Sequence, residues 1–377
     1  MDGDGDGDGG GEGDGDGDGK RRAGRPQPTG LRGRPSGHPL PDPLPDPLSH
    51  PAPDPATLGN PTVPEGAAKP GWNATHIPDQ SGRTAVVTGA NGGIGYITAR
   101  ELARRGASVV LACRSAARGK AAEIRLRAEV PGAEVEFIAL DLADLASVRE
   151  FAKGFGERRA ALDLLINNAG VMALPYGRTA DGFETQVGVN HLGHFALTGL
   201  LLPRLRAAAP GARIVNVSSG FHALADVDLD DLAYERGYRR WRAYGRSKTA
   251  NLLFTHELSR RFAAAGSAIT AAAAHPGYAS TNLHAGATQD GGTLYARGVA
   301  LANDVVAQPA PGGALPTLYA ATAPGVGQDA FVGPRFGWRI SPARSWRAKW
   351  TLDDKSGERL WAASEKLTGV SYASLPR

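Results

Sequence analysis

Two side chains in the segment AYGRSKTAN, Tyr244 and Lys248, have the types and the spacing of an acid/base pair. Residues four apart lie above one another on one face of an α-helix, so the ammonium can act on the phenol. Carbonyl reduction by hydride needs a proton at the oxygen, and a free tyrosine, with a pKa of ~10, exchanges protons poorly near neutral pH. A lysine ammonium, with the positive ring of an oxidised nicotinamide, favours the phenolate and lowers that pKa. The alternative is two polar side chains on the solvent face of a helix.

A glycine-rich turn lies far upstream, in the segment VVTGANGGIGYITA. Gly89, Gly93 and Gly95 stand between an apolar, strand-like run and a helical pattern. Glycine lets a backbone turn sharply and approach a pyrophosphate, while a helix N-terminus offers unpaired N–H groups to the anion. The spacing differs from G-x-G-x-x-G, so the position at the first strand-to-helix turn favours dinucleotide binding over a purely structural turn.

Strand-like and helical segments alternate from residue 82 onward. Such alternation predicts crossover units and a parallel sheet covered on both faces. We therefore predict a single α/β domain of the Rossmann type, doubly wound, with a central parallel sheet of about seven strands. The expected strands are 83–89, 107–115, 133–142, 162–170, 212–219, 268–277 and 329–334. The expected helices are 96–106, 119–130, 145–161, 183–209 and 248–266.

The first seventy residues differ from the rest in composition. They begin with an Asp-Gly tract and continue as PLPDPLPDPLSHPAPDP, with almost nothing to bury. Such a segment cannot offset the entropy of ordering itself. We predict a disordered low-complexity tail over 1–70 and the folded domain over 71–377.

Charge and cysteine content exclude several classes of function. The net charge is +4 and the basic residues are dispersed among acids, so we expect no nucleic-acid partner. No apolar run approaches the ~18 residues of a membrane span, and no signal peptide opens the chain. The single cysteine, Cys113, excludes an internal disulfide and fits a reducing compartment. We expect a cytoplasmic protein without a membrane span.

Five further segments, read with the glycine turn, resemble those of the short-chain dehydrogenase/reductases. The glycine turn reads T-G-x-x-x-G-x-G, and NNAG, VNHLGHF, IVNVSS, Y-x-x-x-K and HPGYAST follow in order over residues 82–283. The ACRS strand end, the long stretch before Tyr244 and the carboxyl-terminal LWAASEKLTGV resemble the retinol-dehydrogenase-like subgroup. The protochlorophyllide-reductase-like enzymes are an overlapping relative.

The resemblance implies a catalytic set and the role of each member. Tyr244 matches the acid/base, and Lys248 also holds the nicotinamide ribose. Ser219 matches the hydroxyl that fixes the substrate oxygen, whereas strand alternation points Ser218 elsewhere. Asn190 matches the asparagine that bends its helix and holds a water between lysine and solvent.

The same resemblance implies a nucleotide site along the ends of the strands. The second strand ends with Arg114 where an NAD-specific enzyme has an acid, so NADP(H) is the preferred cofactor and NAD(H) the alternative. Asp141 matches the position near the adenine and could also cap a helix. Thr281 matches the residue that orients the carboxamide. The expected cofactor-binding residues are Thr88, Gly89, Asn91, Gly93, Ile94, Gly95, Arg114, Asp141, Leu142, Asn168, Ala169, Gly170, Tyr244, Lys248, Pro276, Gly277 and Thr281.

Three other features carry weaker expectations. His191 and His194 lie three apart, but no carboxylate or cysteine completes a zinc spacing, so we predict no metal site. Cys113 is expected to be a small buried hydrophobe. Segments near 220–243 and 284–313 are expected to form substrate walls, the alternative for the second being a plain surface insertion.

The sequence thus predicts an NADP(H)-dependent oxidoreductase that interconverts a carbonyl and an alcohol on an apolar small molecule. The rival hypothesis is a redox sensor or scaffold that binds the cofactor with little turnover. Pairing through the two long helices after the fourth and fifth strands would give a homodimer or homotetramer.

Overall fold

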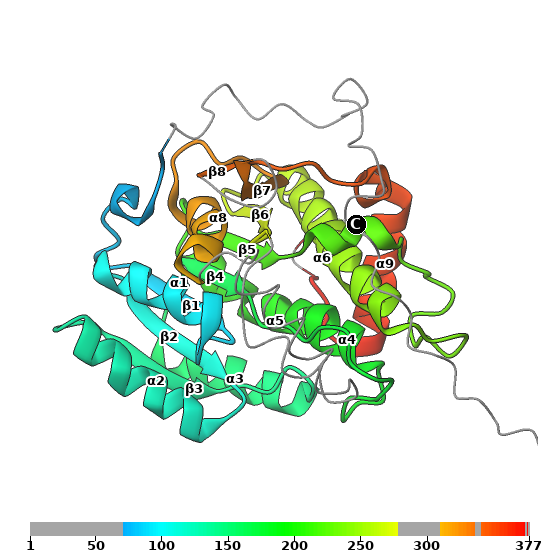
Figure 1. Ribbon diagram of the computed structural model, residues 1–377, viewed down its shortest axis with the longest axis horizontal. Coiled ribbons are helices and arrows are strands. Elements are labelled where there is room, and N and C mark those ends of the chain that lie inside the picture. Colours follow the sequence, from blue (N-terminus) through cyan, green and yellow to red (C-terminus); the bar gives the residue numbers. More distant parts are fainter. Residues whose placement is uncertain (1–70, 278–309, 336–340, 374, 376–377) are drawn as a thin grey trace, which may run out of the picture. The chain divides into compact units, whose positions relative to one another are not determined.

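An eight-stranded sheet with helices on both faces organises the chain (Figure 1). This computed structural model describes residues 71–277, 310–335, 341–373 and 375. The strands are β1 Thr84–Thr88, β2 Ser108–Cys113, β3 Val135–Ala139, β4 Leu164–Asn167, β5 Arg213–Val217, β6 Thr270–Ala274, β7 Ala330–Pro334 and β8 Pro342–Arg344. The main helices are α1 Gly93–Arg104, α2 Ala116–Glu129, α3 Leu145–Arg158, α5 Gly193–Ala207, α6 Arg240–Ala264, α8 Ala310–Thr322 and α9 Asp354–Thr368.

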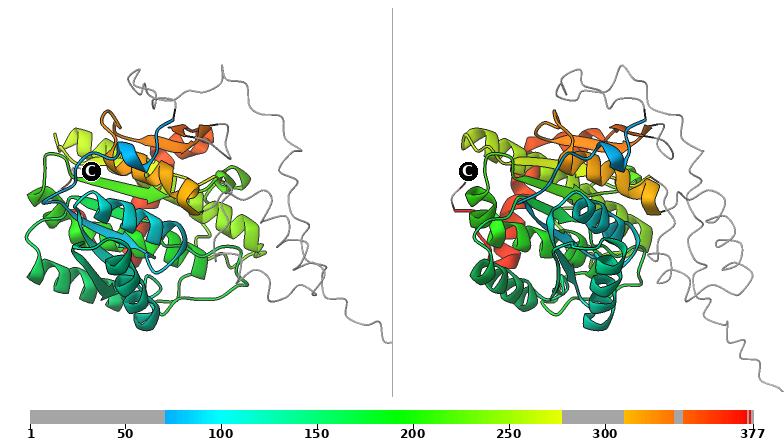
Figure 2. Two further views of the ribbon diagram at one scale, coloured as in Figure 1. Left: turned by 60° about the vertical axis from the view of Figure 1, so that its left-hand side comes forward. Right: turned by 90° about the vertical axis from the view of Figure 1, so that its left-hand side faces the viewer.

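The strand order is β3-β2-β1-β4-β5-β6-β7-β8, and every pair except β7–β8 is parallel. Successive side chains of a strand point to opposite faces, so each buried strand supplies two cores. Val87 and Leu111 pack with α1 and α8, whereas Val86 and Val110 pack with α3, α5 and α6. Figure 2 shows the two helical layers on either side of the sheet. The predicted Rossmann-type fold is confirmed.

The structure corrects three details of the predicted elements. The sheet has eight strands rather than about seven, because the three-residue β8 pairs antiparallel with β7. α6 begins at Arg240, before the expected start at Lys248. The single helix expected over 183–209 is broken into α4 Thr185–Val187, a π-helical turn η3 Gly188–Leu192, and α5.

Several expectations fall outside the described residues. These include the predicted tail 1–70, Thr281, and residues 284–309 of the second predicted substrate wall. The remaining residues of that wall, 310–313, form the first turn of α8, which packs against α1. Within the described ranges, none of the helices combines the length and apolar character needed to cross a membrane.

The last helix, α9, packs against α5 and α6. Trp361 of α9 and Tyr372 after it form an aromatic cluster with Phe195 and Phe254, with ring centroids 4.5 to 6.4 Å apart. The two helices expected to form subunit contacts are α5 and α6. On the side that faces α9, both pack against the chain's own carboxyl-terminal region.

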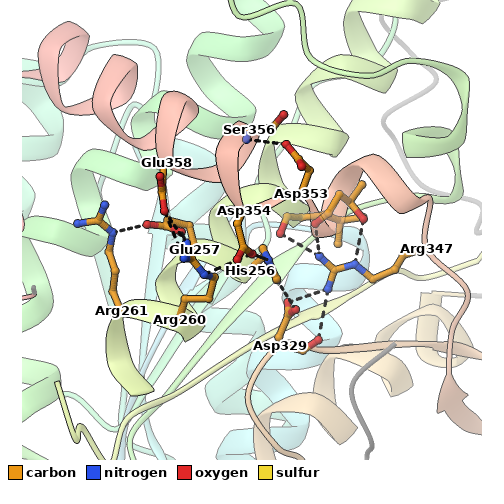
Figure 3. Close-up of polar contacts among 12 residues, drawn as sticks. His256, Glu257, Arg260, Arg261, Asp329, Arg347, Asp353, Asp354, Ser356 and Glu358 are labelled. Carbon is orange, nitrogen blue, oxygen red and sulfur yellow. Dashed lines mark hydrogen bonds and ion pairs between the residues drawn. The ribbon is translucent and has the colours of Figure 1, made fainter. Parts of the chain in front are cut away.

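An ion network with a buried Arg347–Asp329 pair joins the carboxyl-terminal segment to α6 (Figure 3). The fully buried guanidinium of Arg347 lies 2.7 Å from Asp329, just before β7. Asp329 also lies 2.7 Å from His256 of α6, whose other ring nitrogen lies 2.8 Å from Asp354 of α9. Removing one partner of a buried pair leaves an uncompensated charge and typically costs about 3 to 5 kcal/mol. The network therefore fixes the segment around residue 347 in place.

Candidate active site

The predicted site residues lie at one edge of the sheet, where the parallel strands have their carboxyl ends. β1 and β4 are neighbours in the sheet, with β2 and β3 beyond β1 and β5 to β7 beyond β4. The strand order therefore reverses between β1 and β4. In open α/β sheets such a reversal leaves a crevice in which ligands bind.

The glycine turn after β1 has the backbone geometry of a phosphate cradle. Gly89 has a φ of +68°, a region that favours glycine. A Cβ on Gly95 would lie 2.5 Å from Asn168 Nδ2 and 2.6 Å from the Gly89 carbonyl oxygen, so only glycine fits. Gly92, the N-cap of α1, supplies no side-chain cap, which leaves N–H groups of the first turn available. The turn fits a dinucleotide pyrophosphate.

Other residues predicted to bind the cofactor lie in this turn or directly before it in the chain. Ile94 is buried in the core, and Asn91 is half-buried in the turn itself. The Thr88 hydroxyl is fully buried and accepts hydrogen bonds of 2.9 Å from the backbone N–H groups of Asn168 and Ala169. The Thr88 side chain therefore joins the end of β1 to the NNAG segment after β4.

His194 extends this junction to the helix that carries Asn190. Its Nδ1 donates to the Asn190 carbonyl at 3.1 Å, so the neutral ring accepts from the Thr88 hydroxyl at 2.9 Å through Nε2. Burial lowers the pKa of His194 to about 4, which keeps the ring neutral. The contact with Thr88 shows that His194 supports the site, which its spacing from His191 did not indicate.

His191 has a different setting. Its Nε2 lies 2.8 Å from the Ser364 hydroxyl of α9. The part of the chain that the structure describes holds no group of three histidine, cysteine or acidic residues arranged for a metal ion.

Asn190 lies in the π-helical turn η3, and its side chain is fully engaged there. Its Oδ1 accepts from the Val171 N–H at 2.8 Å, and its Nδ2 donates to the Val171 carbonyl and the Ser247 hydroxyl, both at 2.9 Å. π-helical turns inside helices are frequent at functional sites. The turn brings Asn190 against Gly170, where a Cβ would lie 3.2 Å from Asn190 Oδ1 and 3.4 Å from Lys248 Nζ.

Tyr244 and Lys248 are both buried on the inner face of α6, one helical turn apart. Lys248 Nζ donates to the Val217 carbonyl at 3.1 Å, and burial lowers its pKa to about 8. Burial also raises the pKa of Tyr244 to about 12, although a hydrogen bond with the Ser219 side chain acts in the opposite direction. The expected lowering of the tyrosine pKa is therefore absent from the free protein, because the loss of hydration outweighs the hydrogen bond with Ser219.

The two serines after β5 separate as strand alternation predicts. The Ser218 hydroxyl is buried and donates to the Lys248 carbonyl at 2.8 Å, so it supports α6. Ser219 is half-buried, and its hydroxyl accepts from the Phe221 N–H at 3.2 Å as the N-cap of the short helix η4 Gly220–Leu224. Of the two, Ser219 is the one whose side chain reaches Tyr244.

The end of β2 is basic and exposed. Arg114 is exposed directly after β2, and Arg118 is exposed in the first turn of α2. Neither guanidinium forms an ion pair with another of the described residues. Buried Cys113 lies beneath the glycine turn, where the backbone N–H groups of Ala90 and Asn91 face its sulfur, and burial raises its pKa to about 11. Arg118 was missed from the sequence, although its position four residues after Arg114 was readable.

Asp141 follows β3 and does not cap α3. It closes a turn by accepting from the Ala143 N–H at 2.9 Å, whereas Asp144 caps the helix by accepting from the N–H groups of Ala146 and Ser147. The N-cap interpretation of Asp141 is thus wrong, because the N-cap lies three residues later, at Asp144. Leu142 is buried against α5, where a Cβ on Gly193 would lie 2.5 Å from its carbonyl oxygen.

The end of β6 completes the edge. Pro276 and Gly277 follow His275 and are half-buried, and Gly277 has a φ of +68°. Its N–H donates to His275 Nδ1 at 3.2 Å.

Apolar side chains surround the phenol ring of Tyr244. Met172 and Ala173 pack with it, and the ring of Phe221 lies 5.8 Å from it in an edge-to-face contact. Trp241 stacks on Phe221 at 5.2 Å. Both ends of the predicted wall 220–243 therefore border Tyr244.

The model of the short chain dehydrogenase family matches residues 83–291. The chain belongs to the short-chain dehydrogenase/reductase family. Human retinol dehydrogenase 12 is 43% identical over 293 residues, which cover 77% of this chain and 88% of that protein. The match confirms membership of the retinol-dehydrogenase-like subgroup of this family. Short-chain dehydrogenase/reductases are oxidoreductases with an NAD(P) cofactor, and this subgroup interconverts carbonyls and alcohols.

Two solved structures are similar to this chain in fold. An uncharacterized protein from Mycobacterium paratuberculosis shares 46% identity and a TM-score of 0.67, covering 80% of this chain and 99% of its own. RhlG from Pseudomonas aeruginosa, solved as an NADP active-site complex, shares 26% identity and a TM-score of 0.52, covering 68% of this chain and 95% of its own.

Proposed function

We propose that this short-chain dehydrogenase/reductase uses NADP(H) to interconvert a carbonyl and an alcohol on an apolar small molecule, with Tyr244 as the acid/base. The observation that carries the proposal is that Tyr244 meets both Ser219 and Lys248, with Lys248 Nζ beside Gly170 of the NNAG segment. When bound, the cofactor supplies or accepts the hydride.

Tyr244 delivers the proton in the reductive direction. With a pKa of about 12 in the free protein, the phenol is protonated at neutral pH and ready to act as an acid. The Ser219 hydroxyl holds the substrate oxygen within hydrogen-bond reach of it. In the oxidative direction Tyr244 must accept a proton, and the Lys248 ammonium favours the phenolate that this requires.

The preference for NADP(H) rests on the exposed guanidinium groups of Arg114 and Arg118 at the end of β2. A planar guanidinium pairs with a phosphate through two hydrogen bonds, which suits a ribose 2′-phosphate. The NADP complex of RhlG supports the same choice.

An apolar substrate fits the side chains around Tyr244. Met172, Phe221 and Trp241 offer apolar contact and few polar partners, so a polar substrate would lose hydration without compensation. The name of retinol dehydrogenase 12 makes a retinoid aldehyde or alcohol the first substrate to test.

The test is the oxidation of NADPH with all-trans-retinal and a panel of apolar ketones, followed at the nicotinamide absorbance. Tyr244→Phe removes only the hydroxyl and should lower kcat at least about a hundredfold, the size expected for a positioned acid. The matched control is Tyr176→Phe, because Tyr176 is a solvent-exposed tyrosine elsewhere. Wild-type turnover by Tyr244→Phe would overturn the mechanism, and NADPH binding without turnover on the whole panel would favour the redox sensor.

A further inference from the structure

His222 is a buried histidine whose proton position is fixed by its neighbours. Its Nε2 lies 3.1 Å from the backbone N–H of Ala348, which can only donate. Nε2 is therefore the acceptor, and Nδ1 carries the proton that it donates to the Ser219 carbonyl at 2.7 Å. The neutral ring thus bridges the Ser219 loop and the carboxyl-terminal segment.

His275 has the same kind of setting at the end of β6. Its Nδ1 accepts from the Gly277 N–H, so Nε2 carries the proton and donates to the Ser345 hydroxyl at 2.7 Å. A Cβ on Gly333 would lie 2.0 Å from His275 Nε2, so glycine at this point of β7 makes room for the ring. This second neutral imidazole joins the Gly277 turn to the same carboxyl-terminal segment.

The two histidines share one aromatic neighbour. The ring of Phe331 lies 5.6 Å from His222, edge-to-face, and 5.1 Å from His275. Between Ser345 and Ala348, the buried Arg347 is held by Asp329 and by the carbonyls of Leu252 and Thr351 (Figure 3). The carboxyl-terminal segment that both histidines contact is therefore anchored to the core.

We propose that His222 and His275 are positioning residues for the reaction, and we call His222, His275, Phe331, Ser345 and Ala348 the histidine clasp. The inference rests on the proposed function. His222 holds the Ser219 carbonyl while the Phe221 N–H holds its hydroxyl, so both polar groups of Ser219 are constrained. His275 fixes the direction of the Gly277 N–H at the edge of the sheet where the cofactor of the proposed function would be held.

Variants that imitate one ring nitrogen at a time test the His222 half of the clasp. His222→Asn keeps a donor near Nδ1, and His222→Gln keeps an acceptor near Nε2. His222→Phe should lower kcat about tenfold or more with KM for NADPH within about twofold, because a shift of ~1 Å in a positioned group costs up to about a hundredfold. His222→Asn should recover most of kcat, whereas His222→Gln should stay low.

The His275 half predicts the opposite kinetic pattern. His275→Phe should raise KM and Kd for NADPH about tenfold, with a smaller effect on kcat, because it frees the Gly277 N–H. Ser345→Ala removes one hydroxyl from the clasp and should cause a milder change in the same direction. It serves as the second variant if His275→Phe fails to fold.

The control is His256→Asn, which loosens the carboxyl-terminal region through Asp329 and Asp354 without touching either active-site loop. Equal losses of kcat in His256→Asn and His222→Phe, at matched Tm, would overturn the positioning role, as would His222→Asn no more active than His222→Phe. Wild-type kinetics in the clasp variants beside an inactive Tyr244→Phe would reject the clasp and leave the proposed function intact. Activity in Tyr244→Phe would reject the proposed function itself.

Discussion

Lys248 Nζ lies 5.7 Å from the centre of the Tyr244 ring, and both side chains are more than nine-tenths buried. Burial moves the two pKa values in opposite directions, to about 12 for Tyr244 and about 8 for Lys248. The free enzyme therefore holds a neutral phenol beside a lysine that loses its charge just above physiological pH. The charge available to the active site depends on pH through Lys248.

The first prediction is that NADPH affinity falls as pH rises through about 8. Lys248 has a lowered pKa, so its ammonium is present below that pH and lost above it. Hydrogen bonds from a charged donor contribute about 1.5 to 3 kcal/mol, so Kd should rise about tenfold between pH 7 and pH 9.5. Fluorescence titration of bound NADPH measures it. Lys248→Met should bind weakly and independently of pH over this range, and a flat profile for the wild type would contradict the assignment.

The second prediction concerns the basic end of β2. Arg114→Ala should lower kcat/KM for NADPH about tenfold to a hundredfold and leave kcat/KM for NADH nearly unchanged, because only NADPH carries the 2′-phosphate. Arg118→Ala should act in the same direction with a smaller effect. Arg125→Ala, which removes a guanidinium stacked on Tyr96 farther along α2, is the control. An equal loss with both cofactors in Arg114→Ala would place the effect outside phosphate recognition.

The third prediction separates two glycines of the same turn. Gly95→Ala should destabilise the protein by about 1 to 3 kcal/mol and weaken NADPH binding, since its Cβ would enter the space of Asn168 and Gly89. Gly92→Ala should cost less, about 0.5 to 1 kcal/mol for alanine at an N-cap, because no atom lies within 4 Å of the added Cβ and φ is −174°. Urea unfolding of both variants measures the difference. Equal stability of the two variants would show that the turn tolerates a side chain at either glycine.

Much of this arrangement was readable from the sequence, for a physical reason. Buried parallel strands appear in a sequence as short apolar runs, and all seven predicted strands are present in the structure. The glycine turn and Tyr244 are recognisable from local sequence motifs. The short strand β8, Pro342–Arg344, has no such apolar pattern. It is a strand only because its position in the fold lets it pair with β7. At Asn190 only a bend in the helix was expected. The change of hydrogen-bond pattern that makes a π-helical turn cannot be recognised from the amino-acid composition of the segment.

Contacts between distant segments were not readable. The Thr88 hydroxyl hydrogen-bonds with His194 and the NNAG backbone, and these partners are known only once the order of the strands is known. The pKa of Tyr244 was expected to fall, because spacing shows the lysine but not the burial that opposes it. Local chemistry was thus predictable, whereas desolvation and long-range hydrogen bonds needed the structure.

The fourth prediction is that stability falls steeply below pH 6.5 because four histidines are buried and neutral. Burial lowers the pKa of His194 and His222 to about 4 and of His191 and His275 to about 3, from 6.5. Between these values the unfolded chain binds protons that the folded protein does not, so the free energy of unfolding rises with pH. From pH 7 to pH 5.5 each histidine should remove about 1 kcal/mol, and the four together several kcal/mol.

Urea unfolding at pH 7 and pH 5.5 measures this loss. His256 opposes this loss in part, because its raised pKa contributes stability that is fully present below 6.5 and is lost as pH rises through the folded value. His191→Phe removes one of the four histidines and should reduce the loss between the two pH values by about a quarter. If the wild type and His191→Phe lost the same stability on acidification, His191 would have to be charged in the folded protein, against its burial beside Phe195 and Phe254.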